Sequence, residues 1–289
     1  MSTQTSSRIA DAGPRLGKRL SALSSAGLAF LLGALPVGLA AQTDYYNTDA
    51  GRPVRVEDAY ATERYAFELK LAPVRLERAG AGLYNWGIEP EIAYGLLPRT
   101  HLELGLPLVI IDAGGAASER GIAGFEISLL HNLNAETQTL PALGLRGDVL
   151  LPVGRFAPER TYASVTGLVT RTWRFARVHL NGRYTVGASP SPTGSGASEV
   201  DRWLAGVALD RAFPLRALLL IADVYALQPI DAAAAIEWHT GAGVRYQLGP
   251  QLALDAGIGR RLTGNPSWYV TFGTAYAFGL RGLIRGVSR

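Results

Sequence analysis

The chain of 289 residues contains no cysteine. This absence excludes disulfide bonds, and it also excludes a lipid-anchored lipoprotein, whose anchor is attached to a cysteine. Long hydrophobic runs are missing after Ala41, because no later apolar stretch reaches the roughly 20 residues that a transmembrane helix needs. Any crossing of a membrane must therefore be made by β-strands.

The sequence also lacks the short motifs of common catalytic and metal sites. No His-Glu-x-x-His, Cys-x-x-Cys or Gly-x-Ser-x-Gly pattern occurs, and the four histidines are scattered over distant segments. Glu89 and Glu91 share one face of a segment and are conceivable as an acid–base pair, although such a pair more often meets arginines. We therefore predict no catalytic residue, no metal and no cofactor.

A strong charge of one sign is missing from most of the chain. Residues 1–41 hold four basic residues and one acidic residue, a net charge of +3, whereas the whole chain carries +4. The remainder therefore has a net charge of only +1, and it contains no basic patch with interleaved aromatic residues. We predict no nucleic-acid partner.

The amino-terminal region has the features of an export signal. Four basic residues precede the apolar run 26–41, which contains Pro36 and ends in small residues. A membrane-anchoring helix is the alternative, but the run is too short and is broken by the proline. We predict that residues 1–41 are a secretory signal peptide and that the protein is exported to the outer membrane of a diderm bacterium.

The remainder of the chain contains a long series of segments in which apolar and polar residues alternate. Near the end, Trp268, Val270 and Phe272 fall on one face of a strand, while Tyr269 and Thr271 fall on the other. The twelve strands predicted in this way are residues 65–78, 84–97, 100–112, 122–134, 140–153, 161–173, 176–188, 201–213, 215–229, 234–248, 251–262 and 268–280. The predicted fold is all-β, a closed antiparallel transmembrane β-barrel over residues 65–280.

The connections between these strands alternate in length. Every second connection is a tight turn, with one exception, and the others are mostly longer, up to residues 189–200. This alternation is expected of an outer-membrane barrel with both ends in the periplasm, and closure removes the exposed strand edges. We predict a monomer that is inserted by the barrel-assembly machinery and surrounded by outer-membrane lipid. Phe278 would close the last strand, ahead of a basic tail, residues 281–289.

Two prolines do not fit continuous strands. Pro90 and Pro107 lie inside predicted strands, where each lacks the N–H group that the ladder needs. We expect a bulge or shortened pairing at each of them.

The face of each strand opposite its apolar residues carries most of the charged side chains. These residues are the candidates for lining the barrel lumen: Glu68, Lys70, Glu89, Glu91, Glu103, Glu126, Arg146, Asp148, Arg171, Arg177, His179, Arg183, Asp223, Glu237, His239, Arg245, Asp255 and Arg261. They can form an ionic network that fills the interior, or they can line a path whose acidic and basic walls act on a polar or amphipathic solute. The sequence supports both interpretations.

Residues 42–64 precede the first strand and show no strand pattern. The segment contains both acidic and basic residues, among them Arg52, Arg55, Glu57 and Asp58. These charges are complementary to those of the predicted lumen. We therefore expect this polar lead-in to fold partly into the barrel as a plug.

Three stretches of the sequence also support a resemblance to a family. They are residues 52–59, Arg-Pro-Val-Arg-Val-Glu-Asp-Ala, residues 63–69, Glu-Arg-Tyr-Ala-Phe-Glu-Leu, and residues 84–100, which contain a Leu-Leu-Pro-Arg-Thr turn. With them the chain resembles the outer-membrane transporter family described as a component of the phenol meta-cleavage pathway. The resemblance implies a porin-like barrel that passes small, aromatic or hydrophobic, solutes, and it defines no binding residues.

The combined prediction is an outer-membrane channel or transporter for the uptake of small-molecule solutes. The alternatives are a closed structural barrel without transport and, third, an outer-membrane hydrolase. Passage of ions distinguishes the first two, and esterase or lipase turnover would identify the third.

Overall fold

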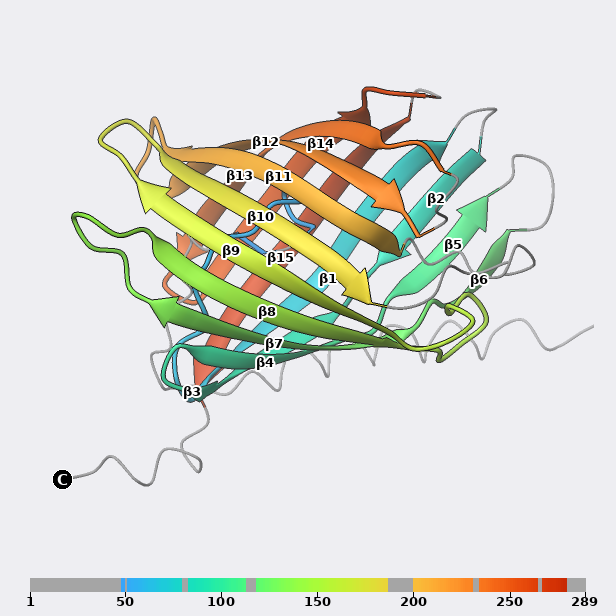
Figure 1. Ribbon diagram of the computed structural model, residues 1–289, viewed down its shortest axis with the longest axis horizontal. Helices are drawn as coiled ribbons and strands as arrows, with labels where there is room; N and C mark the ends of the chain where they lie inside the picture. The colour runs from blue at the N-terminus through green and yellow to red at the C-terminus, as the bar shows by residue number, and fades with distance from the viewer. Residues whose placement is uncertain are drawn as a thin grey trace, which may run out of the picture. The chain divides into compact units, whose positions relative to one another are not determined.

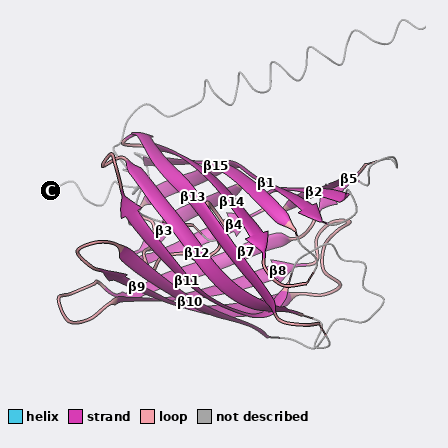
Figure 2. Ribbon diagram, turned by 90° about the horizontal axis from the view of Figure 1, so that it is seen from above, coloured by secondary structure: helices cyan, strands magenta, loops and turns pink. Residues whose placement is uncertain are grey.

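The computed structural model describes residues 48–49, 51–79, 83–112, 118–186, 200–230, 234–264 and 267–279. The predicted signal peptide and the predicted carboxy-terminal tail lie outside these residues. No helix long and apolar enough to cross a bilayer occurs in the part of the chain that the structure describes. The described chain instead forms a sheet of fifteen strands (Figures 1 and 2).

The strands cover nearly all of the expected barrel region. They are β1 (Ala66–Ala79), β2 (Leu83–Ile88), β3 (Glu91–Leu97), β4 (Thr100–Gly105), β5 (Leu108–Asp112), β6 (Glu119–Ile122), β7 (Phe125–Asn134), β8 (Ala142–Leu151), β9 (Tyr162–Thr172), β10 (Arg177–Val186), β11 (Asp201–Ala212), β12 (Leu218–Pro229), β13 (Glu237–Gly249), β14 (Leu252–Arg261) and β15 (Trp268–Gly279).

The sheet closes on itself as a barrel. Each strand pairs antiparallel with its neighbours, and β15 pairs with β1 from Ala66↔Gly279 to Arg78↔Trp268. Three pairs, β2 with β3, β4 with β5 and β6 with β7, are halves of single crossings, so the barrel has twelve strands in the usual sense. The predicted fold class is confirmed, and the predicted strand bounds match the observed ones to within a few residues.

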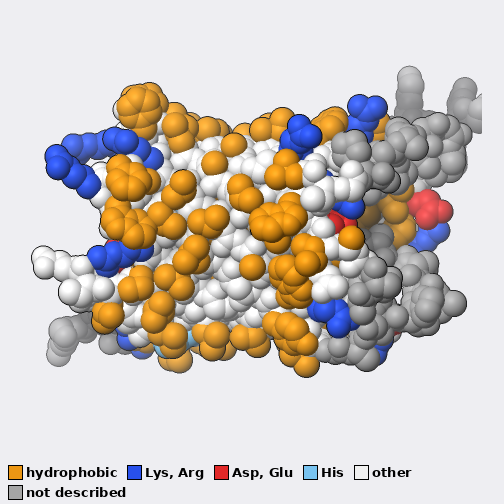
Figure 3. Space-filling view, turned by 45° about the horizontal axis from the view of Figure 1, so that its top comes forward, with side chains coloured by type: hydrophobic (Ala, Val, Ile, Leu, Met, Phe, Trp, Pro, Cys, Tyr) orange, Lys and Arg blue, Asp and Glu red, His pale blue; other side chains and the backbone are white. Residues whose placement is uncertain are grey.

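Burial follows the alternation of the sequence. In β15, Tyr269 and Thr271 are buried, whereas Phe272 is exposed. Leu180 of β10 and Ile258 of β14 are likewise exposed on the outer surface. Figure 3 shows apolar side chains spread over one face of the barrel and arginines gathered toward its two ends. Such an apolar outer band is expected of a barrel in lipid.

The two prolines interrupt their strands as expected. β2 ends before Glu89 and Pro90, and β4 ends before Leu106 and Pro107. A third interruption, between β6 and β7, was not predicted and lies at Ala123 and Gly124, where Gly124 has a φ of 140°. A side chain at that φ would be strained, so glycine permits the bend there.

A bulge in β1 changes which side chains face the barrel interior in the part of the strand that follows it, residues 74–79. The register with β15 shifts between Leu71 and Val74, around Pro73. Before the shift the even-numbered Glu68 and Lys70 face the interior, and after it the odd-numbered residues do, because Arg75 is opposite the buried Thr271.

Candidate functional site: the barrel interior

The described part of the lead-in, residues 48–49 and 51–64, runs through the barrel interior, where it appears as the blue segment in Figure 1. Wall side chains bind its backbone. One carboxylate oxygen of Asp223 accepts hydrogen bonds from the N–H groups of Arg55 and Val56, at 2.7 and 3.3 Å. Asn181 accepts the N–H of Glu57 and donates its amide to the carbonyl of the same residue, both at 2.8 Å. The wall therefore replaces the strand partner that the segment lacks.

A second group of wall side chains binds the lead-in at Ala59. The side-chain amide of Asn132 donates to the Ala59 carbonyl at 2.7 Å, and the Ala59 N–H donates to the hydroxyl of Thr170 at 3.0 Å. His179 contacts Thr170 through Nδ1 and Asp210 through Nε2, each at 3.0 Å. These buried side chains form a continuous hydrogen-bonded chain that ends on the backbone of the lead-in.

Glycines in the wall make room for the segment. A Cβ at Gly257 would lie 2.1 Å from the Pro53 carbonyl oxygen, and one at Gly273 would lie 1.8 Å from a guanidinium nitrogen of Arg52. Both contacts are closer than any side chain allows. The groove that holds the lead-in is therefore built into β14 and β15.

Ion pairs join the lead-in to the wall around Lys70. The Lys70 ammonium lies 3.2 Å from Asp49 of the lead-in, 2.9 Å from Glu91 and 2.5 Å from Glu103. Arg245, which is fully buried, also binds Asp49 at 2.8 Å. Although burial opposes it, these cations together with Arg52 hold the pKa of the Asp49 carboxyl well below its usual range.

Arg146 of β8 is the second centre of the network. Its guanidinium contacts Glu57 of the lead-in and Glu103 of the wall, each at 3.1 Å, and Asp148 at 2.6 Å, and it lies 3.5 Å from Glu126. One cation therefore faces four carboxylates. Burial raises the pKa of the Glu57 carboxyl to about 7; the charge of Arg146 opposes this shift, and the charges of Asp148 and Glu103 reinforce it.

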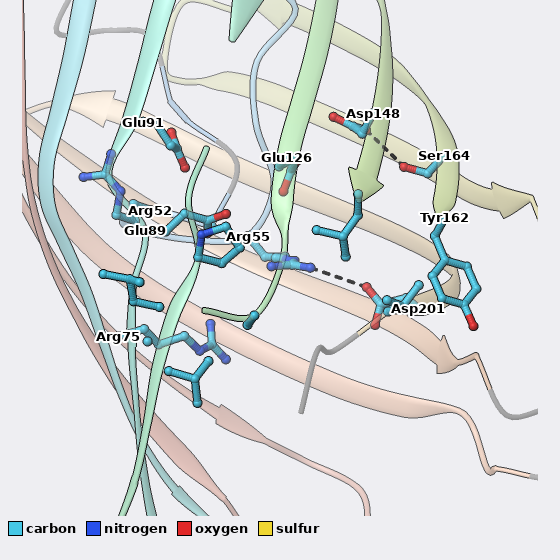
Figure 4. Close-up of a pocket in the computed structure, with 18 of the residues that line it drawn as sticks. Arg52, Arg55, Arg75, Glu89, Glu91, Glu126, Asp148, Tyr162, Ser164 and Asp201 are labelled. Atoms are coloured by element: carbon cyan, nitrogen blue, oxygen red, sulfur yellow. Dashed lines mark hydrogen bonds and ion pairs between the residues drawn. The ribbon is translucent and has the colours of Figure 1, made fainter. Parts of the chain in front are cut away.

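A cavity of about 350 Å³ is lined by the lead-in and by strand residues that adjoin the longer loops, such as Tyr162 and Asp201 (Figure 4). Charged side chains from the lead-in and the wall line it, including Arg52, Arg55, Glu89, Glu126 and Asp148. Its charged lining from β8 to β11 includes Arg183 and Asp201, which form an ion pair, and its lining from β5 is apolar. The cavity thus offers charges of both signs together with an apolar side, which is what an amphipathic solute requires.

A second, much smaller cavity of about 20 Å³ also adjoins the lead-in. Its lining includes Asp49, Lys70 and His101. Glu57 and Arg146 are the two residues that line both cavities. Their ion pair therefore stands between the two spaces.

The structure brings most of the predicted lumen residues together, but in separate groups. The network around Lys70 and Arg146 contains Glu68, Glu91, Glu103, Glu126, Asp148, Arg245 and Asp255. Arg177 and His179 meet at Asp210, and Glu237 binds both His239 and Arg261, at 3.1 Å each. Glu89 and Arg183 line the large cavity, and Asp223 binds the lead-in.

Arg171 does not share the interior with the other candidates. Along β9, Thr166, Leu168 and Thr170 are the buried residues, so Arg171 lies in the opposite phase. Its guanidinium donates to the carbonyls of Thr137, Gln138 and Leu140 in the turn between β7 and β8. Arg171 therefore holds a turn at the end of the barrel.

Sequence reasoning missed several interior residues. Arg75 and Glu77 line the large cavity because the bulge in β1 reverses their phase. Pro73, inside the predicted first strand, was the available signal for that bulge. Asp49 was missed because nothing in the pattern of the lead-in distinguishes it. Asp201 was overlooked because a register shift between Asp201 and Trp203 reverses its phase relative to Asp210 of the same strand.

The interior contains one arrangement that resembles catalytic machinery. Thr170, His179 and Asp210 are bonded in the order of a hydroxyl, an imidazole and a carboxylate, as in hydrolases. All three are buried, and the hydroxyl already accepts the N–H of Ala59. Because Thr170 is bonded to the backbone of Ala59, the three side chains position the lead-in.

No group of acidic residues and histidines that could hold a metal ion occurs among the described residues.

The fold is similar to solved outer-membrane barrels. An outer membrane channel from Pseudomonas putida F1 matches with a TM-score of 0.50 and 14% identity, covering 80% of this chain and 100% of that one. KdgM porin matches with a TM-score of 0.47 and 9% identity over 73% of this chain and 99% of the porin. NanC porin matches with a TM-score of 0.47 and 10% identity over 72% and 98%. No protein-family model and no curated protein matches the sequence.

Proposed function

We propose that the protein is an outer-membrane channel for small solutes and that the lead-in closes the channel as a plug. The observation that carries this proposal is the position of the Glu57–Arg146 ion pair between the two cavities. Because Glu57 belongs to the lead-in and Arg146 to the wall, release of the lead-in would join the two spaces. The solved structure from Pseudomonas putida F1, which has the same fold, is called a channel.

The proposed solute is a small molecule with an aromatic or otherwise apolar body and a polar group. The charged lining would orient the polar group, and Val109 and Ile111 would contact the apolar body. The resemblance noted in the sequence points to the same class. A signal peptide at residues 1–41 and insertion as a monomer by the barrel-assembly machinery complete this proposal.

A closed structural barrel is the second candidate, because the ionic network fills the interior around the lead-in. Single-channel recording in planar bilayers separates the two functions. We expect ion current that a small phenolic compound partly blocks. A correctly folded barrel that stays silent, both as the full chain and after removal of residues 42–60, would contradict the channel function and favour the structural one.

Charge reversal at Glu89 is expected to change the ion selectivity of the channel. Glu89 lines the large cavity beside Glu91 and Glu126, and no ion pair joins it to another described residue. Glu89→Lys should therefore shift the permeability ratio toward anions by severalfold without breaking an existing pair. Reversal potentials in a salt gradient measure the ratio. Glu89→Gln should give an intermediate shift, and equal ratios for all three proteins would mean that Glu89 does not line the path.

Opening of the plug is expected to depend on pH through Glu57. The pKa of its carboxyl in the docked segment, about 7, lies above the ordinary value of 4.5. The docked segment therefore binds this proton more tightly than a released segment does, so docking is strongest below about pH 4.5 and weakens as the pH rises toward about 7. We expect open probability to increase from pH 5 to pH 7.5. Glu57→Gln should reduce this dependence to the part that remains with the Asp58 carboxyl, whose pKa burial raises to about 6. An unchanged profile in that variant would assign the dependence to other groups.

A further inference from the structure

The outer surface of the barrel carries two arginines at the end where the connections from β1 to β2 and from β14 to β15 leave the sheet. Arg78 is the last residue but one of β1, and Arg260 is the last residue but one of β14. β15 runs between these two strands and begins at Trp268, which is directly opposite both arginines. The three residues therefore form one row across neighbouring strands, with the tryptophan in the middle.

The side chains of this row point away from the barrel interior. Glu77 lines the large cavity, so Arg78 beside it points outward, because successive residues of a strand point to opposite sides. Tyr269 is buried, so Trp268 beside it also points outward. Arg260 is exposed, as Arg78 is. The row therefore faces the surrounding membrane.

Neither arginine of the row forms an ion pair with a carboxylate in the part of the chain that the structure describes. The Arg78 guanidinium lies 5.9 Å from the centre of the Tyr84 ring, a contact that leaves its charge in place. Among the described residues, the outward faces of β1, β2, β14 and β15 carry no acidic side chain, and Asp112 of β5 is separated from Arg78 by β2. The row is therefore positively charged at the edge of an apolar surface, where an anionic lipid is a favourable partner.

The outward residues below the row are apolar. Leu76 of β1 pairs with Val270 of β15, and Val270 pairs with Ile258 of β14. Phe272, the next outward residue of β15, is exposed. Outward residues of one strand are about 7 Å apart, so the positive charges lie one step above the band that contacts lipid chains. A lipid that carries a phosphate just above its acyl chains matches this arrangement.

The orientation predicted for the barrel places the row in the outer leaflet. The first and last described residues of the barrel wall, Ala66 and Gly279, pair with each other at the opposite end. Because that end is predicted to face the periplasm, Arg78 and Arg260 face the outside of the cell. The lipid of the outer leaflet is lipopolysaccharide, and its lipid A part carries phosphates on a sugar backbone directly above the acyl chains.

We propose that Arg78, Trp268 and Arg260 form a binding site for lipopolysaccharide on the outer surface of the barrel. The two arginines are two strand spacings apart, about 10 Å, so both guanidinium groups can reach one phosphate placed over Trp268. Arginine binds phosphate through paired N–H donors, and these charge-assisted hydrogen bonds are strong. The indole of Trp268 would contact the sugar backbone, and the acyl chains would lie on the apolar residues below.

Titration of the refolded protein with diphosphoryl lipid A tests the site, and native mass spectrometry from detergent measures the affinity. Arg78→Gln with Arg260→Gln should weaken binding at least about twentyfold, and each substitution alone about fivefold, which is the effect of one arginine near an anionic lipid. Lipid A without its phosphates should bind the unaltered protein as weakly as diphosphoryl lipid A binds the double variant. Equal affinities of the unaltered protein and the double variant for diphosphoryl lipid A would overturn the proposal.

A matched pair of arginines at the other end of the barrel controls for general charge attraction. Arg174 and Arg216 are exposed in the turns that follow β9 and β11. Arg174→Gln with Arg216→Gln removes the same charge and should leave the affinity for lipid A unchanged. An equal loss in this pair would overturn the assignment to the row. All four arginines are exposed, so the variants should fold, and the migration of unheated samples in gels checks this.

Phosphatidylglycerol serves as the second lipid, because it has a phosphate above acyl chains but no sugar backbone. We expect it to bind the unaltered protein severalfold more weakly than lipid A does. Trp268→Leu should weaken the binding of lipid A severalfold and leave that of phosphatidylglycerol unchanged. Equal affinities for the two lipids would overturn lipopolysaccharide as the occupant of the site.

This inference goes beyond the proposed channel function, since the site lies outside the lumen and binds a lipid of the surrounding membrane. Single-channel conductance should therefore be the same for the unaltered protein and for the double variant of Arg78 and Arg260. A barrel that passes no ions but binds lipid A through both arginines would contradict the channel alone. Ion current together with lipid A binding that ignores both arginines would contradict the lipid site alone.

Discussion

Removal of residues 42–60 is expected to raise the single-channel conductance by roughly an order of magnitude. The deletion removes Glu57 from the ion pair between the two cavities and removes Arg52 and Asp49 from the network around Lys70. The freed space would fill with water, because the wall residues that remain are charged. Planar-bilayer recording of the refolded barrel, with folding checked by its resistance to unfolding in detergent, measures the effect.

Two variants of the full chain serve as controls for the deletion. Glu63→Ala alters an exposed residue of the same segment and should leave the conductance unchanged. Simultaneous replacement of Arg52, Glu57 and Asp58 by serine keeps the segment and the ion pairs of Asp49 with the wall but removes the pairs of Arg52 with Asp255 and of Glu57 with Arg146. It should give an intermediate conductance. A folded deletion variant with the conductance of the full chain would show that the lead-in does not close the path.

Arg146→Leu is expected to lower the free energy of unfolding by about 3–5 kcal/mol, the usual cost of removing one partner from a buried ionic group. Arg146 is buried and neutralises Glu57, Glu103, Asp148 and Glu126. Its loss leaves carboxylates facing one another without a cation, apart from the contact of Glu103 with Lys70. Urea titration followed by tryptophan fluorescence in detergent micelles gives the change.

An exposed arginine provides the control for this measurement. Arg211 lies on the outward face of β11, so Arg211→Leu should change the free energy of unfolding by less than about 1 kcal/mol. Adding Glu57→Gln to Arg146→Leu should recover part of the loss, because one uncompensated carboxylate disappears. Equal stabilities of the Arg146 and Arg211 variants would show that the interior charges are solvated and do not depend on the network.

The strands and their faces could be predicted because successive residues of a strand point to opposite sides, so apolar and polar residues alternate along the sequence. Trp268 and Phe272 lie opposite Tyr269 and Thr271 as the alternation requires. Pro90 was also informative, since a missing N–H limits pairing wherever the chain runs. These features depend only on neighbours along the chain.

Other features depend on contacts between distant residues, and the sequence could not supply them. Whether the side chain of Arg75 points into the barrel depends on the bulge in β1. Arg171 points the other way and binds the turn between β7 and β8, which the sequence does not place beside it. The coincidence of the interruptions at Pro90, Pro107 and Gly124 depends on strand register, which alternation within one strand does not fix. The pairing of Asp49 with Lys70 likewise required the path of the lead-in.

The way in which the wall holds the lead-in has a consequence for how sequences of this kind can diverge. Asp223, Asn181 and Asn132 bind backbone groups, which every amino acid possesses, and Gly257 and Gly273 supply clearance. The lead-in can thus exchange many of its side chains and remain bound, whereas each of these five wall positions tolerates little change. A comparison of related chains should therefore find these five wall residues retained in the strands, even where the sequence of the lead-in has changed too much to be aligned.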